Sequence, residues 1–134
     1  MSVDATVGIV LVSHSAALAE GTADLAGQMG GGQVHIVAAG GTDDGRLGTS
    51  IDKVARALAE ADTGAGVLVL PDLGSSVLTV RALVAQDGPL PAPLEVADAP
   101  FVEGAVAAAV AAATGGDIEA VLTAAQEARH ARKL

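Results

Sequence analysis

Four short apolar runs divide this chain into similar units. The run that ends at Val12 and the run at 67–70 consist almost entirely of Val, Leu and Ile, with no polar alternation. This pattern is typical of strands buried on both faces of a parallel sheet. The shorter runs at 34–39 and 94–97 are predicted as two further strands.

Apolar residues recur at helical spacing after each of these runs. The pattern predicts helices over about 15–29, from a capping box at 49–52, after 76, over 101–113 and after 117. Glycines separate several of these segments, and a loop with three prolines is predicted over 87–93. The inward stripes are expected to be Leu18, Thr22, Leu25 and Met29; Ile51, Val54, Leu58 and Ala61; Val77, Val80 and Val84; and Ile118, Val121, Leu122 and Ala125.

Strands that alternate with helices through short links predict an α/β fold. We expect a doubly wound open sheet of about four parallel strands with helices on both faces, forming one domain over residues 1–134. Right-handed crossovers and the strongly apolar first strand favour the strand order 2-1-3-4. The topological switch point, where ligands of such sheets bind, then lies between strands one and three.

The amino-acid composition limits the kinds of molecule that this chain is expected to bind. The formal net charge is −9, and the chain has one Phe, no Trp and no Tyr. Nucleic acid is therefore an improbable partner, because neither positive charge nor stacking surfaces are available. The chain has no cysteine and no long uninterrupted apolar segment, and its first twelve residues lack a basic start. We expect a soluble cytoplasmic protein without disulfides or a membrane partner.

His14 is the strongest candidate for a reactive side chain. It stands between the first strand and the first helix, where free backbone N–H groups and the helix dipole favour an anion such as a phosphoryl group. A simple N-capping role for His14 explains its position equally well. His35 lies within a strand and His130 in a cationic tail, so both are expected to be structural or solvated.

Asp72 favours the catalytic interpretation of His14. The predicted strand order places it beside His14, where its carboxylate can accept the Nδ1 proton and leave Nε2 as the nucleophile. The alternative is that Asp72 is a turn or capping residue. Backbone N–H groups at two helix starts and nearby hydroxyls are expected to bind the phosphoryl oxygens. These hydroxyls belong to Ser13, Ser15, Ser75 and Ser76.

Other chemistries fit the sequence less well. The Gly-x-Ser-x-Gly elbow of serine hydrolases and the phosphate-binding Gly-x-x-x-x-Gly-Lys loop are absent. A metal site that combines Asp43, Asp44, Asp72 and His14 is only weakly indicated, and we expect no metal and no cofactor. A phosphoaspartate receiver would need an acidic pair after the first strand, where this chain has Ser-His-Ser.

Four blocks carry a resemblance to a known family. They read Ile-Val-Leu-Val-Ser-His-Ser at 9–15, Ala-Ala-Gly at 38–40, Asp-Leu-Gly-Ser at 72–75 and Ala-Pro-Phe-Val-Glu-Gly at 99–104. In this order they resemble the mannose-type EIIA family of the bacterial phosphotransferase system, in particular its members that serve dihydroxyacetone kinase. The resemblance extends over nearly the whole chain.

The resemblance implies a homodimeric phosphoryl carrier. His14 would be phosphorylated on Nε2 by phospho-HPr, and Asp72 would orient its ring. Gly40, Thr42, Gly74 and Ser75 would lie in the loops around the site. The phosphoryl group would pass to ADP held in the DhaL subunit, and from there to dihydroxyacetone on DhaK. The small side chains of Ala105 to Ala113 would allow close helix packing in a dimer.

Two other functions stay open at this point. One is an EIIA domain that serves a sugar transporter of the mannose class, and the other is a non-catalytic binding or regulatory module on the same fold. The blocks at 72–76 and 99–104 favour the kinase over the transporter. Some members of the family continue into HPr-like and enzyme I-like domains. We expect separate proteins to supply these functions here.

Overall fold

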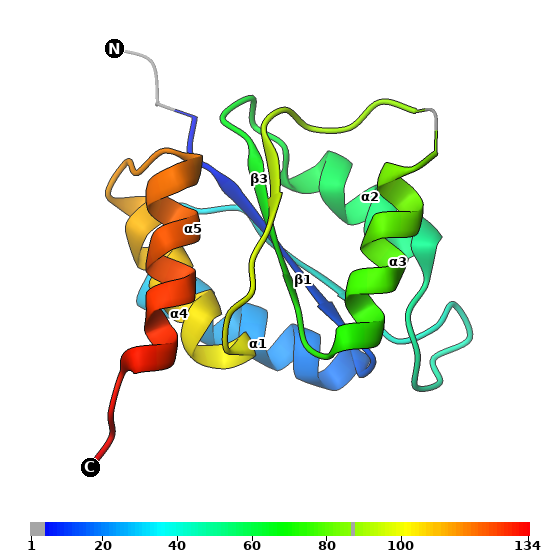
Figure 1. Cartoon of the computed structure of the whole chain (residues 1–134), viewed down its shortest axis with the longest axis horizontal. Helices are drawn as coiled ribbons and strands as arrows, with labels where there is room; N and C mark the ends of the chain where they lie inside the picture. Colours follow the sequence, from blue (N-terminus) through cyan, green and yellow to red (C-terminus); the bar gives the residue numbers. More distant parts are fainter. Residues whose placement is uncertain (1–4, 87) are drawn as a thin grey trace.

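A single parallel sheet forms the centre of the molecule (Figure 1). The structure, a computed structural model, describes residues 5–86 and 88–134. The strands are β1 (Gly8–Ser13), β2 (Ile36–Gly40), β3 (Val67–Pro71) and β4 (Leu94–Val96). All neighbours are parallel, and the order is β2-β1-β3-β4, which confirms the predicted topology.

Helices cover both faces of the sheet, as expected for a doubly wound fold. They are α1 (Ala16–Met29), α2 (Ile51–Ala61), α3 (Gly74–Val84), α4 (Phe101–Ala113) and α5 (Ile118–Glu127), followed by the short 3₁₀ helix η1 (Ala128–His130). Helices α1, α4 and α5 lie on one side of the sheet and α2 and α3 on the other (Figure 1). None of the described helices combines the length and apolarity needed to span a bilayer.

The two faces of the sheet pack against different kinds of side chain. Alternate residues of β1 and β3 point to opposite faces, as strand geometry requires. On the α1/α4/α5 face, Ile9 and Leu11 meet a layer made mainly of alanines. On the α2/α3 face, Val10 and Val12 meet larger side chains such as Leu58 and Val80. All of these are fully or nearly fully buried.

The orientation predicted for α1 is wrong. Thr22 is buried as expected, but the rest of the buried stripe consists of Ala19 and Ala26, whereas Leu18, Leu25 and Met29 are 42, 45 and 58 % exposed. The helix is turned by one residue because it packs closely through small groups. A Cβ on Gly40 would lie 2.9 Å from Cβ of Ala19, so strand and helix meet where only glycine fits.

Helix α3 is also turned relative to the prediction. Val80 is buried, but its companions are Ser76 and Leu83, and Val84 is 45 % exposed. The side of α3 that carries Ser76 is held against the sheet by a hydrogen bond to Asp72. Strand β2 begins at Ile36, two residues later than predicted. The stripe of α2 and the Ala-rich α4 are confirmed.

Two regions of the sequence prediction lie outside the described residues. Residues 1–4 belong to the first twelve residues, where no basic start is present in the sequence, and Asp87 begins the predicted proline-rich loop. The described remainder of that loop, 88–93, contains no helix or strand, in agreement with the prediction.

Candidate functional site

His14 lies directly after β1, at the carboxyl edge of the sheet. Its backbone N–H donates to Oδ2 of Asp72 over 3.0 Å, and its ring is 27 % exposed. The N-cap of α1 is Ser15, whose hydroxyl accepts from the N–H of Leu18. The alternative that His14 is itself the N-cap is therefore wrong, and its ring is left for another role.

Asp72 meets His14 as the strand order predicts. It follows β3, the neighbour of β1, and its N–H donates to the carbonyl of Val12 over 2.9 Å. Nδ1 of His14 lies 3.0 Å from Oδ1 of Asp72. Two residues 58 positions apart thus share the switch point of the sheet.

Asp72 is surrounded by hydrogen-bond donors. Oδ2 accepts from the hydroxyl of Ser13 and the backbone of His14, and Oδ1 accepts from the hydroxyl of Ser76, the backbone of Leu73 and the His14 ring. Burial alone would raise the pKa of this carboxyl, but the bonds from Ser76, His14 and Ser13 outweigh burial and lower the pKa to about 2. Asp72 is therefore ionised at neutral pH.

An ionised Asp72 defines the tautomer of His14. A carboxylate only accepts, so in the neutral ring Nδ1 carries the proton and Nε2 has a free lone pair. Nε2 lies 2.5 Å from Oγ of Ser75, which donates to it in this tautomer. The ring is thus held at both nitrogens, and Nε2 lies at the exposed side of the site.

The four serines predicted to bind phosphoryl oxygens occupy different positions. Ser75 is exposed and contacts Nε2 of His14. Ser15 uses its hydroxyl to cap α1. Ser13 and Ser76 are completely buried, and their hydroxyls donate to Asp72 and not toward solvent. The expected helix starts are present, with Gly74 as the first residue of α3 and open space around its Cα.

The loop after β2 is attached to the backbone at Ser13 and His14. Gly41 donates its N–H to the carbonyl of Ser13, and Gly48 donates to the carbonyl of His14. Within the loop, the Thr42 hydroxyl bonds to Asp44 and accepts from the N–H of Arg46. Thr42 therefore shapes the loop beside the site. The bond from Gly48 to the backbone of His14 was not predicted from the sequence.

Gly40 is required where β2 meets the start of α1. A Cβ at this position would lie 2.6 Å from the carbonyl oxygen of Ser15 and 2.7 Å from Cα of Ala16. Its own carbonyl accepts from the ammonium group of Lys53 over 3.0 Å. Gly40 is thus a packing residue that allows α1 to begin close to the sheet.

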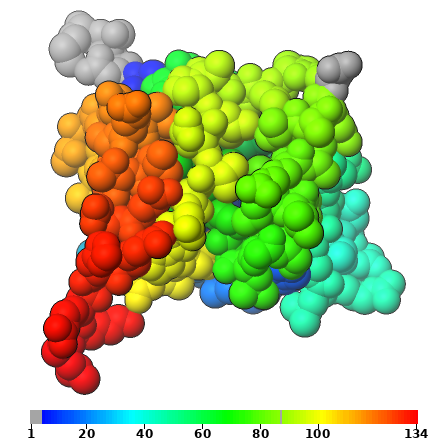
Figure 2. Space-filling view, in the orientation of Figure 1, coloured from blue at the N-terminus to red at the C-terminus, as the bar shows by residue number. Residues whose placement is uncertain are grey.

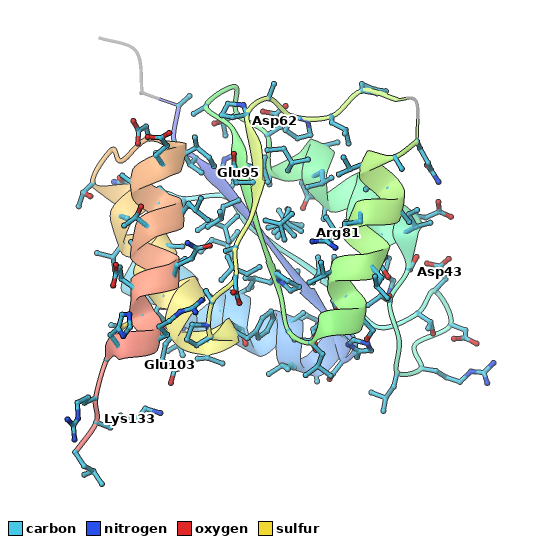
Figure 3. All side chains as sticks on the ribbon, in the orientation of Figure 1. Asp43, Asp62, Arg81, Glu95, Glu103 and Lys133 are labelled. Carbon is cyan, nitrogen blue, oxygen red and sulfur yellow. The ribbon has the colours of Figure 1, made fainter. Side chains whose placement is uncertain are left out.

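A cleft of about 390 Å³ opens on the other side of Asp72, between α3 and the segment that follows β4. Figure 2 shows this part of the surface as a hollow between the green α3 and the yellow segment after β4. Arg81 of α3 and Asp98 line it, and Figure 3 shows the Arg81 side chain directed from α3 toward the strands. In the described chain, no Lys or Arg forms an ion pair with His14 or Asp72.

Of the acidic residues considered for a metal site, Asp72 contacts His14, whereas Asp43 and Asp44 are bonded within and beside the loop after β2. Asp43 accepts from Ser50, and Asp44 pairs with Arg46 within the loop after β2. Figure 3 places Asp43 on this loop, at the outer edge of the molecule. Across residues 5–86 and 88–134 there is no group of three or more His, Asp or Glu residues that could hold a metal ion.

Comparison with known proteins places this geometry in a family. The EIIA-man family model, described as the PTS system fructose IIA component, matches residues 8–122. The phosphoryl donor subunit DhaM of PEP-dependent dihydroxyacetone kinase 2 from Listeria innocua is 39 % identical over 117 residues, which is 87 % of this chain and 94 % of that protein.

Two further proteins extend the comparison. The phosphoryl donor subunit DhaM of the PEP-dependent dihydroxyacetone kinase from Escherichia coli is 37 % identical over 131 residues, covering 95 % of this chain and 28 % of its own length. The crystal structure of a protein of unknown function, EF1359, superposes with a TM-score of 0.80 at 34 % identity, covering 91 % of this chain and 94 % of that one.

Proposed function

Because the chain belongs to the EIIA-man family, we propose that it is a phosphoryl carrier that serves a dihydroxyacetone kinase. His14 accepts the phosphoryl group on Nε2 and passes it to ADP bound by a partner subunit. The observation that carries this proposal is the pairing of Nδ1 of His14 with the ionised Asp72, which in the neutral ring leaves the lone pair on Nε2, at the exposed side of the switch point.

Phosphorylation uses the lone pair of Nε2. This lone pair forms a bond to phosphorus while the bond between phosphorus and the donor breaks, and the electron pair of that bond returns to the donor. Nδ1 keeps its proton, so the ring gains a positive charge that the carboxylate of Asp72, 3.0 Å away, stabilises. The Ser75 hydroxyl is freed from Nε2 and donates to a phosphoryl oxygen instead.

Release reverses this step. An oxygen of the terminal phosphate of ADP forms the new bond to phosphorus, the P–Nε2 bond breaks, and its electron pair returns to the ring. Such transfers pass through a loose transition state in which alignment and charge stabilisation supply most of the rate. Helix α3 begins at Gly74, two residues after Asp72, and a helix start favours a phosphoryl group through its free N–H groups and its dipole; the partner contributes any cation that is needed.

Exposed leucines around His14 support docking of partner proteins at this face. Leu73 follows Asp72 and is 62 % exposed, Leu78 lies one turn beyond Gly74 and is 64 % exposed, and Leu47 precedes Gly48 and is 80 % exposed. Large apolar side chains at one exposed site are characteristic of protein interfaces. The proposed donor is phospho-HPr, and the proposed acceptor is DhaL with its bound ADP, which supplies DhaK.

We also propose a homodimer, although not through the alanines of α4. Ala105, Ala108, Ala109 and Ala112 are buried within the chain itself. Better candidates for a subunit interface are Leu25 and Met29 of α1 together with Val110 of α4, which are 43–58 % exposed on two helices that contact each other. Sedimentation of the chain and of Met29→Glu would test this proposal, with dissociation expected for the variant.

Reconstitution tests the phosphoryl relay. The chain is mixed with enzyme I, HPr and phosphoenolpyruvate, and base-stable, acid-labile phosphate on His14 is measured. DhaL with bound ADP is then added and ATP is assayed. Formation of ATP is the expected result. Labelling of His14 without ATP would instead favour a sugar-transport component, and the absence of labelling would reject the carrier role.

A further inference from the structure

Two buried hydroxyls near the site bond to Asp72 and have no direct part in the phosphoryl transfer described so far. Ser13 at the end of β1 and Ser76 in the first turn of α3 are both completely buried. Each donates a hydrogen bond to Asp72, one to each carboxylate oxygen, over 2.9 and 2.7 Å. Neither faces the exposed space where a phosphoryl group would lie.

The orientation of the Ser13 hydroxyl is fixed by its other partner. Its oxygen accepts from the backbone N–H of Ser15 over 3.0 Å, so its own proton is directed to Asp72. Ser76 occupies the complementary position. Its oxygen lies 2.7 Å from Oδ1 of Asp72 and 3.3 Å from Nδ1 of His14, beside the bond that joins ring and carboxylate.

We propose that Ser13 and Ser76 are positioning residues that keep Asp72 an ionised acceptor of low basicity, so that the Nδ1 proton stays on His14 while Nε2 carries the phosphoryl group. This inference rests on the proposed function. It adds that the two hydroxyls, through Asp72, determine how readily the phosphoryl group leaves Nε2. Both residues act through Asp72 and not by contact with phosphate.

The location of one proton determines the leaving group. When Nε2 is phosphorylated, the ring is positively charged and its Nδ1–H becomes more acidic. If that proton moved to Asp72, the P–Nε2 bond could break only by releasing an imidazolate, which is a poor leaving group. If the proton stays on Nδ1, neutral imidazole leaves. A weakly basic carboxylate therefore favours onward transfer.

Hydrogen-bond donors counteract the burial of Asp72. Its side chain is only 8 % exposed, and burial makes a carboxylate more basic. Donors to the charged form have the opposite effect, and two of the four donors besides the His14 ring are these hydroxyls. The other charged groups that line the adjacent cleft are Arg81 of α3 and Asp98 after β4, and neither forms an ion pair with Asp72 within the described residues.

The first test is a direct titration of Asp72 by carboxyl ¹³C NMR in unphosphorylated protein. We expect the pKa of Asp72 to rise by about one unit in Ser13→Ala and in Ser76→Ala, and further in the double variant. Ser→Cys variants, which keep a weaker donor, should give intermediate values. Thr22→Ala, which removes another buried hydroxyl from α1, should leave the pKa unchanged.

The second test measures transfer from phosphorylated protein. The Ala variants should pass phosphate to DhaL–ADP several-fold more slowly, their phosphohistidine should be longer-lived, and the acid limb of the pH profile should move to higher pH. An unchanged Asp72 pKa in the folded double variant would overturn the proposal, as would a raised pKa with unaltered transfer. If His14 takes up no phosphate, the proposed function fails. The titration of unphosphorylated protein still decides whether the two hydroxyls lower the pKa of Asp72.

Discussion

The molecule contains two pairs of imidazole and carboxylate with different surroundings. At the end of β1, His14 lies 3.0 Å from Asp72, and the side chains are 27 and 8 % exposed. At the end of α5, His130 lies 3.7 Å from Glu127, and the side chains are 72 and 67 % exposed. The first pair has additional donors from β1, from α3 and from the backbone of His14 and Leu73, whereas the second is an exposed contact within one helical turn. Both pairs consist of an imidazole and a carboxylate, so it is their surroundings that would set His14 apart from His130.

The largest difference between the two pairs is expected for the substitution His14→Gln. Glutamine keeps a polar side chain of moderate size but has no nitrogen nucleophile, so phosphoryl transfer should fall to background while the fold persists. The matched His130→Gln should transfer normally. Incorporation of radiolabelled phosphate from phosphoenolpyruvate measures both variants. Normal labelling of the His14 variant would remove the distinction between the two pairs.

The second test concerns the two carboxylates. Asp72→Asn keeps the shape but removes the charge that fixes the tautomer, and it leaves the buried hydroxyls of Ser13 and Ser76 with a poorer acceptor. We expect transfer to fall about 10- to 100-fold, as for other residues that orient a functional histidine. Glu127→Gln serves as the control in the same assay, and a comparable loss in that variant would contradict the contrast.

The same carboxylate should contribute to stability in a defined pH range. The pKa of Asp72 is lowered from 3.8 to about 2 in the folded protein, so its ionised form stabilises the fold above pH 4, and this contribution is lost as the pH falls toward 2. The loss corresponds to about 2 kcal/mol in the free energy of unfolding. Urea unfolding between pH 5 and pH 2.5 should show this loss in the wild type but not in Asp72→Asn.

A smaller effect is expected from the apolar surface around the first pair. Leu73→Asp places a charge where we propose that partners dock, and it should raise KM for phospho-HPr about 10-fold with little change in kcat. Leu134→Asp is a matched control, since Leu134 is also exposed but lies four residues from His130. Equal effects of both substitutions would show that the leucines around His14 form no specific docking surface.

The smallest effect is expected at the second pair itself. Exposed ion pairs contribute little, so Glu127→Ala should change the free energy of unfolding by less than about 0.5 kcal/mol at pH 6. Chemical denaturation of this variant beside the wild type measures the change. A loss of 2 kcal/mol or more would mean that this pair is not the passive contact that its exposure indicates.

The sequence was sufficient to place His14 beside Asp72, because strand order brings the carboxyl ends of β1 and β3 together. The sequence did not show which serine hydroxyls bond to Asp72 and which lie elsewhere. Ser13 and Ser15 alternate at a strand end, and only the packed structure determines which hydroxyl faces inward. Ser76 stands four residues after Asp72 at a helix start, a spacing from which its hydrogen bond could have been expected.

The buried face of α1 could not be predicted from the sequence for a related reason. Hydrophobic periodicity gives Leu18 and Leu25 more weight than Ala19, so it favours an inward stripe of large residues. The helix in fact approaches Gly40 so closely that only small residues fit at the contact. That contact joins elements distant in sequence, and a local pattern contains no information about it.

The attachment of the loop after β2 has a practical consequence. Its two ends are bonded to consecutive carbonyls, those of Ser13 and His14, while residues 43–47 between them are exposed. Residues 43–47 can therefore be replaced while the two backbone hydrogen bonds of Gly41 and Gly48 stay in place. Grafting other sequences between Thr42 and Gly48 offers a way to present a different surface to acceptor proteins while His14 and Asp72 keep their contact.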